Sequence, residues 1–116
     1  MNIESLREYC LQKKNVTEEL PFINSTLVFK VSGKIFLLTG LDRSPFQFNV
    51  KCDPDKAIEL REQYESVKPG YHMNKKHWIS VYFNKDVPYA KIKELVQKSH
   101  NLIIDGLSNK QKEILD

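Results

Sequence analysis

The residues of this chain best suited to binding a ligand lie in one short segment, from Lys68 to Trp78. This segment contains the single tryptophan, two of the three histidines and three lysines, and it has no acidic residue. The whole chain has 18 Lys and Arg residues against 15 Asp and Glu, so its net charge of +3 equals the charge of these three lysines. Phosphate groups are bound by such clusters of cations and neutral donors. We call residues 68–78 the basic aromatic loop.

The basic aromatic loop offers three kinds of contact to a nucleic acid. Its lysines are expected to neutralise phosphates, and its hydroxyl, amide and imidazole groups to hydrogen-bond with backbone or bases. Its aromatic rings are suited to stacking on bases, which contributes roughly 1–3 kcal/mol per base. The candidate nucleic-acid-binding residues are Lys68, Tyr71, His72, Asn74, Lys75, Lys76, His77 and Trp78.

Two other interpretations of the loop remain open from the sequence. In the first, the loop is only a solvated connection, with Trp78 anchored in the core and Tyr71 holding the turn. In the second, it closes over a groove between helix and sheet, where His72, Lys76 and Trp78 line a pocket for an anionic small molecule or a protein partner. Outward-pointing lysines would favour nucleic-acid binding. Burial of Tyr71 and His72 would favour either the solvated connection or the pocket. The acidic helix expected before the loop would repel phosphate unless its carboxylates point away.

Catalytic and metal chemistry finds little support. His72, His77 and Cys52 are possible metal ligands, but the paired cysteines that usually complete such a site are missing. Nothing in the sequence places the Cys52 thiol beside a base, and we expect it to be a small core residue. His100 is expected on the surface of a helix. No glycine-rich phosphate loop, GxSxG or HExxH motif occurs. We therefore predict a non-catalytic protein without a cofactor or a bound metal.

Alternating apolar residues predict the strands of a sheet. The first two strands are separated only by Ser32-Gly33, a two-residue turn signal, and so form a hairpin. In the third strand Phe46, Phe48 and Val50 share one face, and the three strands together make an antiparallel meander. A fourth strand follows the basic aromatic loop. The expected strands are 26–31, 34–39, 46–51 and 77–83.

Apolar residues at spacings of three and four predict the helices. Asp53-Pro54 combines an N-cap residue with a proline at the first helical position, and Gly106 is a stop signal. Pro21 disfavours helix in the residue before it, so 17–22 is expected to be a connector. The expected helices are 3–14, 53–65, 87–106 and a short one that begins at a capping box, 108–111.

The order α-β-β-β-α-β-α-α predicts an α+β fold of two layers. An antiparallel sheet, a β-meander plus a further strand, is expected to carry its helices mainly on one face. At 116 residues, with 41% apolar and 28% charged residues, the chain is expected to be a single soluble domain, 1–116. No apolar run approaches the length of a membrane span. Cys10 and Cys52 lie far apart in the sequence, which favours reduced thiols and a cytoplasmic location.

The run Pro69-Gly-Tyr-His-Met-Asn-Lys-Lys-His-Trp78 resembles the hallmark of the MmcQ/YjbR-like family. The resemblance covers almost the whole chain and implies a small bacterial cytoplasmic protein with a frataxin-like α+β fold. It also implies DNA binding through a double-wing arrangement of loops, with no established catalytic residues or cofactor. The other matching pieces are Pro21-Phe22, 28–31, 33–36, 51–54, Leu60-Arg61, Val87-Pro88 and Ser99-His100.

Overall fold

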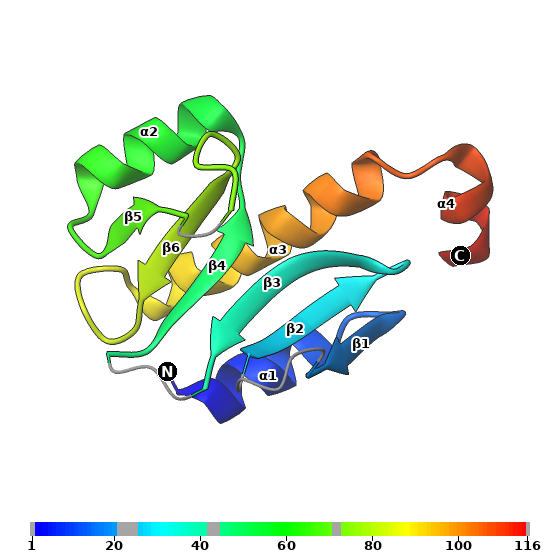
Figure 1. Cartoon of the computed structure of the whole chain (residues 1–116), viewed down its shortest axis with the longest axis horizontal. Helices are drawn as coiled ribbons and strands as arrows, with labels where there is room; N and C mark the ends of the chain where they lie inside the picture. The colour runs from blue at the N-terminus through cyan, green and yellow to red at the C-terminus, as the bar shows by residue number, and fades with distance from the viewer. Residues whose placement is uncertain (1, 21–25, 42–44, 71–72, 116) are drawn as a thin grey trace.

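A six-stranded antiparallel sheet forms one layer of the fold, in the strand order β1-β2-β3-β4-β6-β5 (Figure 1). The computed structural model describes residues 2–20, 26–41, 45–70 and 73–115. Its strands are β1 (Val16–Glu19), β2 (Thr26–Val31), β3 (Lys34–Gly40), β4 (Gln47–Lys51), β5 (Val67–Pro69) and β6 (Trp78–Tyr82). Its helices are α1 (Ile3–Leu11), α2 (Pro54–Gln63), α3 (Tyr89–Asp105) and α4 (Asn109–Leu115).

The helices α1 and α3 pack on one face of the sheet, which confirms the predicted two-layer α+β fold. Figure 1 shows α1 and α3 behind the sheet and α2 beyond its β5–β6 side, whereas α4 extends away from it. Phe29, Leu37, Val50 and Ile79 lie in register on the helix-covered face, and all four side chains are completely buried. Burying one such side chain contributes roughly 1.5–3 kcal/mol relative to leaving it exposed. This apolar layer holds the strands and helices in fixed positions.

The last long helix, α3, is fixed to the sheet by a polar residue. The Ser99 hydroxyl donates to the Phe36 carbonyl oxygen (2.6 Å) and accepts from the Lys51 N–H (2.8 Å). His100 follows and packs edge-on against the Phe36 ring, with 5.2 Å between ring centroids. The prediction that His100 lies on the helix surface is wrong, because only 8% of the residue is exposed. Burial, followed by the nearby Lys13 charge, lowers the pKa of His100 below its ordinary value.

The other face of the sheet carries a mixed row of side chains. The strand register aligns Val28, Leu38, Asn49, Ser80 and Lys68 across five neighbouring strands. The Ser80 hydroxyl donates to the Asn49 side-chain oxygen, and both residues are buried. Lys68 closes the row on the edge strand, where it is exposed. The first lysine of the basic aromatic loop therefore belongs to a strand.

Two short edge strands depart from the expected element boundaries. β1 occupies part of the segment 17–22 that was expected to be a connector. α2 ends at Gln63 instead of extending to residue 65, and β5 begins at Val67. Phe46, expected on the core face, precedes β4 and is 44% exposed. Strands of three or four residues carry too few alternations to be recognised, because the pattern of a strand needs a run of about four to eight residues to stand out.

The local turn and cap signals hold in the structure. Asp53 accepts a hydrogen bond from the Asp55 N–H (3.0 Å), and Pro54 occupies the first helical position of α2. Ser32 and Gly33 both have positive φ, 52° and 76°, as a tight hairpin turn of the type I′ class requires. These signals fix where α2 begins and how β2 meets β3.

Candidate functional site

The basic aromatic loop connects the two strands of the β5–β6 hairpin. The Gly70 N–H donates to the Trp78 carbonyl oxygen (2.9 Å), which extends the pairing of the hairpin by one step. The Cys52 N–H donates to the His77 carbonyl oxygen (2.7 Å) and ties the far side of the loop to the end of β4. Both ends of the loop are therefore held by backbone hydrogen bonds.

The base of the loop requires glycine at position 70. A Cβ atom built there would lie 2.8 Å from the Cβ of Trp78 and 3.0 Å from its carbonyl carbon and oxygen. Those separations are below normal contact, and two of the three neighbouring atoms are backbone. The strand carrying Trp78 therefore passes against Gly70 with no room for a side chain.

The tip of the loop is organised by Asn74. Its side-chain oxygen accepts from the Lys76 N–H (2.9 Å), and its carbonyl oxygen accepts from the N–H groups of His77 (3.1 Å) and Trp78 (3.0 Å). These three bonds close a compact turn that positions Lys75 and Lys76, both exposed. Asn74 thus contributes to the shape of the loop.

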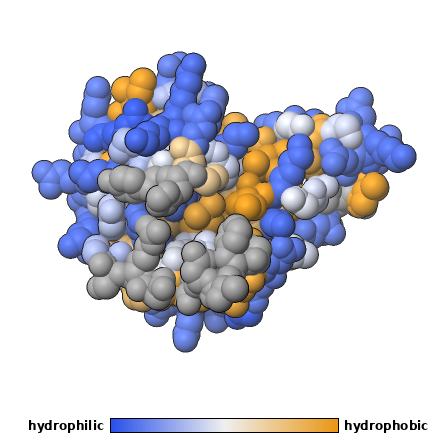
Figure 2. Space-filling view, in the orientation of Figure 1, coloured by the Kyte–Doolittle hydropathy of each residue, from blue (hydrophilic) through white to orange (hydrophobic). Residues whose placement is uncertain are grey.

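The lysines of the loop are not neutralised by the carboxylates of α2. None of the ion pairs within the part of the chain that the structure describes includes Lys68, Lys75 or Lys76. On α2, Glu59 pairs instead with Lys56 of the same helix. Figure 2 shows α2 presenting a largely hydrophilic surface. The local positive charge of the loop therefore faces solvent.

Of the remaining predicted site residues, His77 and Trp78 are half-buried at the exit of the loop. Trp78 pairs in register with Lys51 on the neighbouring strand β4. Tyr71 and His72 lie outside the described residues, so the roles predicted for them stay predictions.

A second hairpin emerges from the same end of the strands. The register of Leu37 with Val50 brings the start of β3 and the end of β4 together, and β6 begins beside that end. Lys34, which follows the β2–β3 turn, is exposed, and Lys51 is half-buried at the end of β4. Figure 1 shows the two hairpin connections splayed apart by the twist of the sheet. The exposed lysines of the two hairpins therefore lie at the same end of the sheet.

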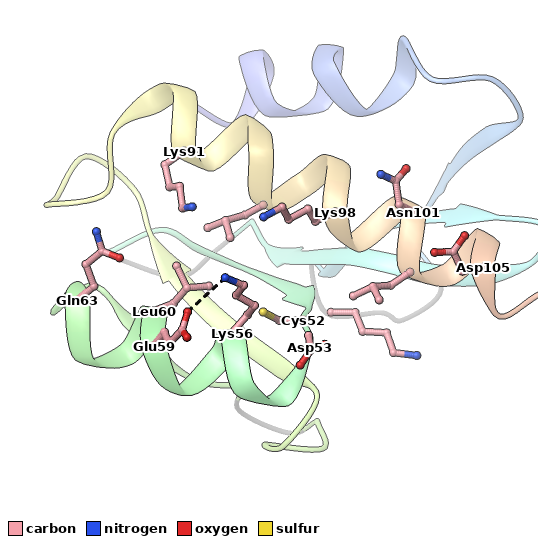
Figure 3. A pocket seen from close by; sticks show the side chains of 13 residues that line it. Cys52, Asp53, Lys56, Glu59, Leu60, Gln63, Lys91, Lys98, Asn101 and Asp105 are labelled. Atoms are coloured by element: carbon pink, nitrogen blue, oxygen red, sulfur yellow. Dashed lines mark hydrogen bonds and ion pairs between the residues drawn. The ribbon is translucent and has the colours of Figure 1, made fainter.

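A separate groove lies between α2 and α3 (Figure 3). It has a volume of about 340 Å³, and its base includes Cys52, Leu60 and Leu95. The side chains of Lys56, Lys91 and Lys98 reach into it from the two helices, whereas Lys76 and Trp78 do not line it. The interpretation in which the basic aromatic loop lines a pocket gains no support from this groove.

The electrostatics of the groove differ from those of the loop because its lysines have carboxylate partners. Lys56 pairs with Glu59 (3.4 Å), and Glu94 accepts from both Lys91 (3.3 Å) and Lys98 (2.9 Å). These two hydrogen-bonded lysines lower the pKa of Glu94, with Lys98 the stronger influence.

At the base of the groove, Cys52 is a free thiol and only 8% exposed. Burial and, secondarily, the negative charge of Asp53 raise the pKa of the Cys52 thiol, so it stays protonated at neutral pH. Among the residues that the structure describes, no three His, Cys, Asp or Glu side chains gather as metal ligands. His72, one of the three ligands considered above, falls outside that set.

Sequence reasoning missed the groove because two helices far apart in the chain assemble it. Lys91 and Lys98 are seven residues apart and share one helix face. That spacing was the one sequence signal, and it is equally typical of a solvated helix surface. Only the packing of α2 beside α3 distinguishes a groove lining from a solvated helix surface.

Comparison with known proteins identifies the family. The model of the YjbR family matches residues 11–102. The chain belongs to the YjbR family. The Escherichia coli O157:H7 protein YbdF is 40% identical over 120 residues, covering 97% of this chain and 96% of YbdF. Escherichia coli K12 YjbR is 27% identical over 115 residues, covering 99% and 98% of the two chains.

Solved structures of related proteins share the fold. The crystal structure of a Deinococcus radiodurans protein with a DUF419 domain superposes with a TM-score of 0.93 at 33% identity, covering 98% of this chain and 87% of that one. A Pseudomonas syringae protein gives a TM-score of 0.77 at 26% identity, covering 88% and 98%. The names of these relatives and of the solved structures specify no ligand. No helix in the described part of this chain combines the length and apolar character needed to cross a membrane.

Proposed function

We propose that this YjbR-family protein is a non-catalytic DNA-binding domain that contacts phosphates through its basic aromatic loop. One observation carries the proposal: Lys68, Lys75 and Lys76 are exposed on a hairpin held at both ends, without an ion-pair partner in the described part of the chain. Lysines held in this way lose little conformational freedom of the backbone when they meet phosphate. Unpaired exposed cations are also the groups that release counterions from DNA.

The second hairpin extends this proposed surface. Lys34 and Lys51 continue the positive charge from the same end of the sheet. The two hairpins act in the proposal as a pair of wings along the sugar–phosphate backbone. Trp78 either stacks on an accessible base or supports the loop from beneath, and Tyr71 and His72 hydrogen-bond to backbone or bases. A cytoplasmic location, where nucleic acid and reducing conditions coexist, belongs to the same proposal.

The salt dependence of binding tests this function. Affinity for a duplex oligonucleotide is measured at several salt concentrations for the wild type and for Lys75→Ala/Lys76→Ala. The wild-type affinity is expected to fall steeply with salt, with a log–log slope of about −0.9 for each phosphate neutralised. The double variant is expected to bind more weakly and to lose about 1.8 from the magnitude of that slope, because it lacks two phosphate contacts.

A matched control separates the loop from net charge. Lys98→Ala/Lys110→Ala removes the same number of exposed positive charges from the helices α3 and α4, outside the two hairpins. It is expected to reproduce the wild-type slope. Equal affinity and slope in the loop variant and the wild type would remove the proposed function.

A further inference from the structure

The α2–α3 groove brings three ammonium groups to one place. Figure 3 shows Lys56 extending from α2, and Lys91 and Lys98 from α3, into the space between the helices. Two carboxylates, Glu59 and Glu94, are their ion-pair partners. The groove lining as a whole contains four lysines, since Lys51 also belongs to it, and three carboxylates, Asp53, Glu59 and Asp105, so it carries one net positive charge. Bringing like charges together is unfavourable unless an anion joins them, so the excess charge favours an anionic occupant.

The base of the groove indicates the chemistry of the part of the ligand that lies beneath the lysines. Leu60, Leu95 and the protonated Cys52 offer apolar surface beneath the lysines. A volume of about 340 Å³ is at the small end of ligand pockets. An inorganic anion would leave the apolar surface in contact with water, and a nucleic-acid duplex is too wide to enter. The combination fits a molecule with one acidic end and one apolar body.

We propose that the groove between α2 and α3 binds a small amphiphilic anion, with a carboxylate or phosphate head beside Lys56, Lys91 and Lys98 and an apolar chain or ring against Leu60 and Leu95. The groove lining includes no described residue of the basic aromatic loop. Lys51, at the end of β4, lines the groove and also belongs to the proposed DNA-binding surface, so the test variants leave Lys51 unchanged.

A fluorescent amphiphilic anion, 8-anilinonaphthalene-1-sulfonate, provides the first probe. The wild type is expected to bind it saturably at one site. Lys56→Gln/Lys98→Gln is expected to bind it at least tenfold more weakly, because hydrogen bonds to charged groups are among the strong ones. Lys75→Gln/Lys76→Gln removes the same charge from the loop and is expected to stay within about twofold of the wild type. Thermal unfolding of each variant verifies that all three proteins are folded.

Competition identifies the chemistry of the occupant. Decanoate and decyl phosphate are expected to displace the probe, and their relative affinities show which head group the lysines prefer. Decyltrimethylammonium, with the same chain and the opposite charge, is expected not to compete. Each methylene removed from the chain is expected to weaken binding about fourfold where that methylene is buried.

The Cys52 thiol supplies a readout inside the groove. At alkaline pH, which is needed to ionise a thiol of raised pKa, decanoate is expected to slow the alkylation of Cys52 by excess uncharged iodoacetamide in the wild type and not in Lys56→Gln/Lys98→Gln, as measured by mass spectrometry. Equal probe affinity in the groove variant and the wild type, competition by the cation, or no protection of Cys52 would each overturn the proposal. DNA binding measured on the same proteins is expected to be reduced by the loop variant alone, so the two proposals fail separately.

Discussion

The basic aromatic loop and the α2–α3 groove use the same residue type in opposite ways. In the loop, Lys75 and Lys76 stand at the exposed tip of a hairpin and have no carboxylate partner in the described part of the chain. In the groove, Lys56 and Lys98 are each paired with a glutamate and reach over apolar side chains. The loop lysines lie on the exposed surface, whereas the groove is a hollow between two helices.

This difference shows that the surroundings of a lysine, more than its charge, indicate which kind of ligand it binds. Exposed, unpaired ammonium groups interact through a screened Coulomb attraction and suit the regularly spaced phosphates of a polymer. Ammonium groups above an apolar base suit a small ligand that also has an apolar part. A count of basic residues along the sequence does not distinguish these cases. Four substitutions test the comparison.

The largest expected effect comes from Gly70→Ala. The new Cβ would clash with Trp78, and overpacking of this kind costs about 1–3 kcal/mol of unfolding free energy. Denaturant unfolding measures the loss, which is expected to accompany weaker DNA binding and unchanged binding of the groove probe. Gly106→Ala is the control, because its φ is −83° and the nearest atoms lie 3.6 Å from the added Cβ. Similar stability of the two variants would show that the loop adapts to a side chain at position 70.

An effect of similar size, but on binding alone, is expected for Trp78→Leu with single-stranded DNA. If the ring stacks on a base, its loss weakens binding to an oligothymidylate by about 1–3 kcal/mol, or roughly 5- to 150-fold. Tyr82→Leu is the matched control, since Tyr82 is also half-buried and lies on the same strand and face, four residues from Trp78. Fluorescence anisotropy measures both. The same affinity for Trp78→Leu and the wild type would restrict the tryptophan to a supporting role.

Acid is expected to affect the helix that builds the groove. Because burial lowers the pKa of His100 in the folded protein, the unfolded chain binds its proton more readily. The contribution of neutral His100 to stability is therefore full above pH of about 6.5 and is lost as pH falls toward the lowered folded pKa.

Denaturant unfolding between about pH 7 and pH 5 measures this slope, and His100→Leu is expected to reduce it. Carboxylates with a lowered pKa, such as Glu94, titrate below 4.5 and contribute little in that range. If the unfolding free energy of His100→Leu depends on pH as steeply as that of the wild type, the pH dependence belongs to another group.

The smallest expected effect comes from Glu59→Gln. Glu59 competes with an external anion for Lys56, and an exposed ion pair is worth about 0.2–1 kcal/mol. Removing it is expected to tighten binding of the groove probe by up to about fivefold, measured by fluorescence titration. Glu62→Gln, on the same helix and outside the groove lining, is expected to have little effect. Weaker binding to Glu59→Gln would mean that the glutamate contacts the ligand directly.

The sequence predicted the fold where its signals are local. Ser32-Gly33 specified a hairpin because only certain residues accept positive φ at both turn positions. Asp53-Pro54 specified the start of α2 through a side-chain cap that acts within three residues. The edge strands β1 and β5 were missed because their pairing depends on strands elsewhere in the chain. His100 was misplaced because it lies beside the apolar stripe of α3, where the exposed fraction depends on what packs against the helix.

For the candidate site, the sequence by itself determined the clustering of Lys68, Lys75, Lys76 and Trp78, since these residues are neighbours in the chain. Only the tertiary structure decided that the carboxylates of α2 leave the loop lysines free of ion pairs in the described part of the chain. It alone brought α2 beside α3 and formed the groove. Electrostatic and apolar contacts act through distances in space, and segments separated by dozens of residues acquire those distances only when the core packs.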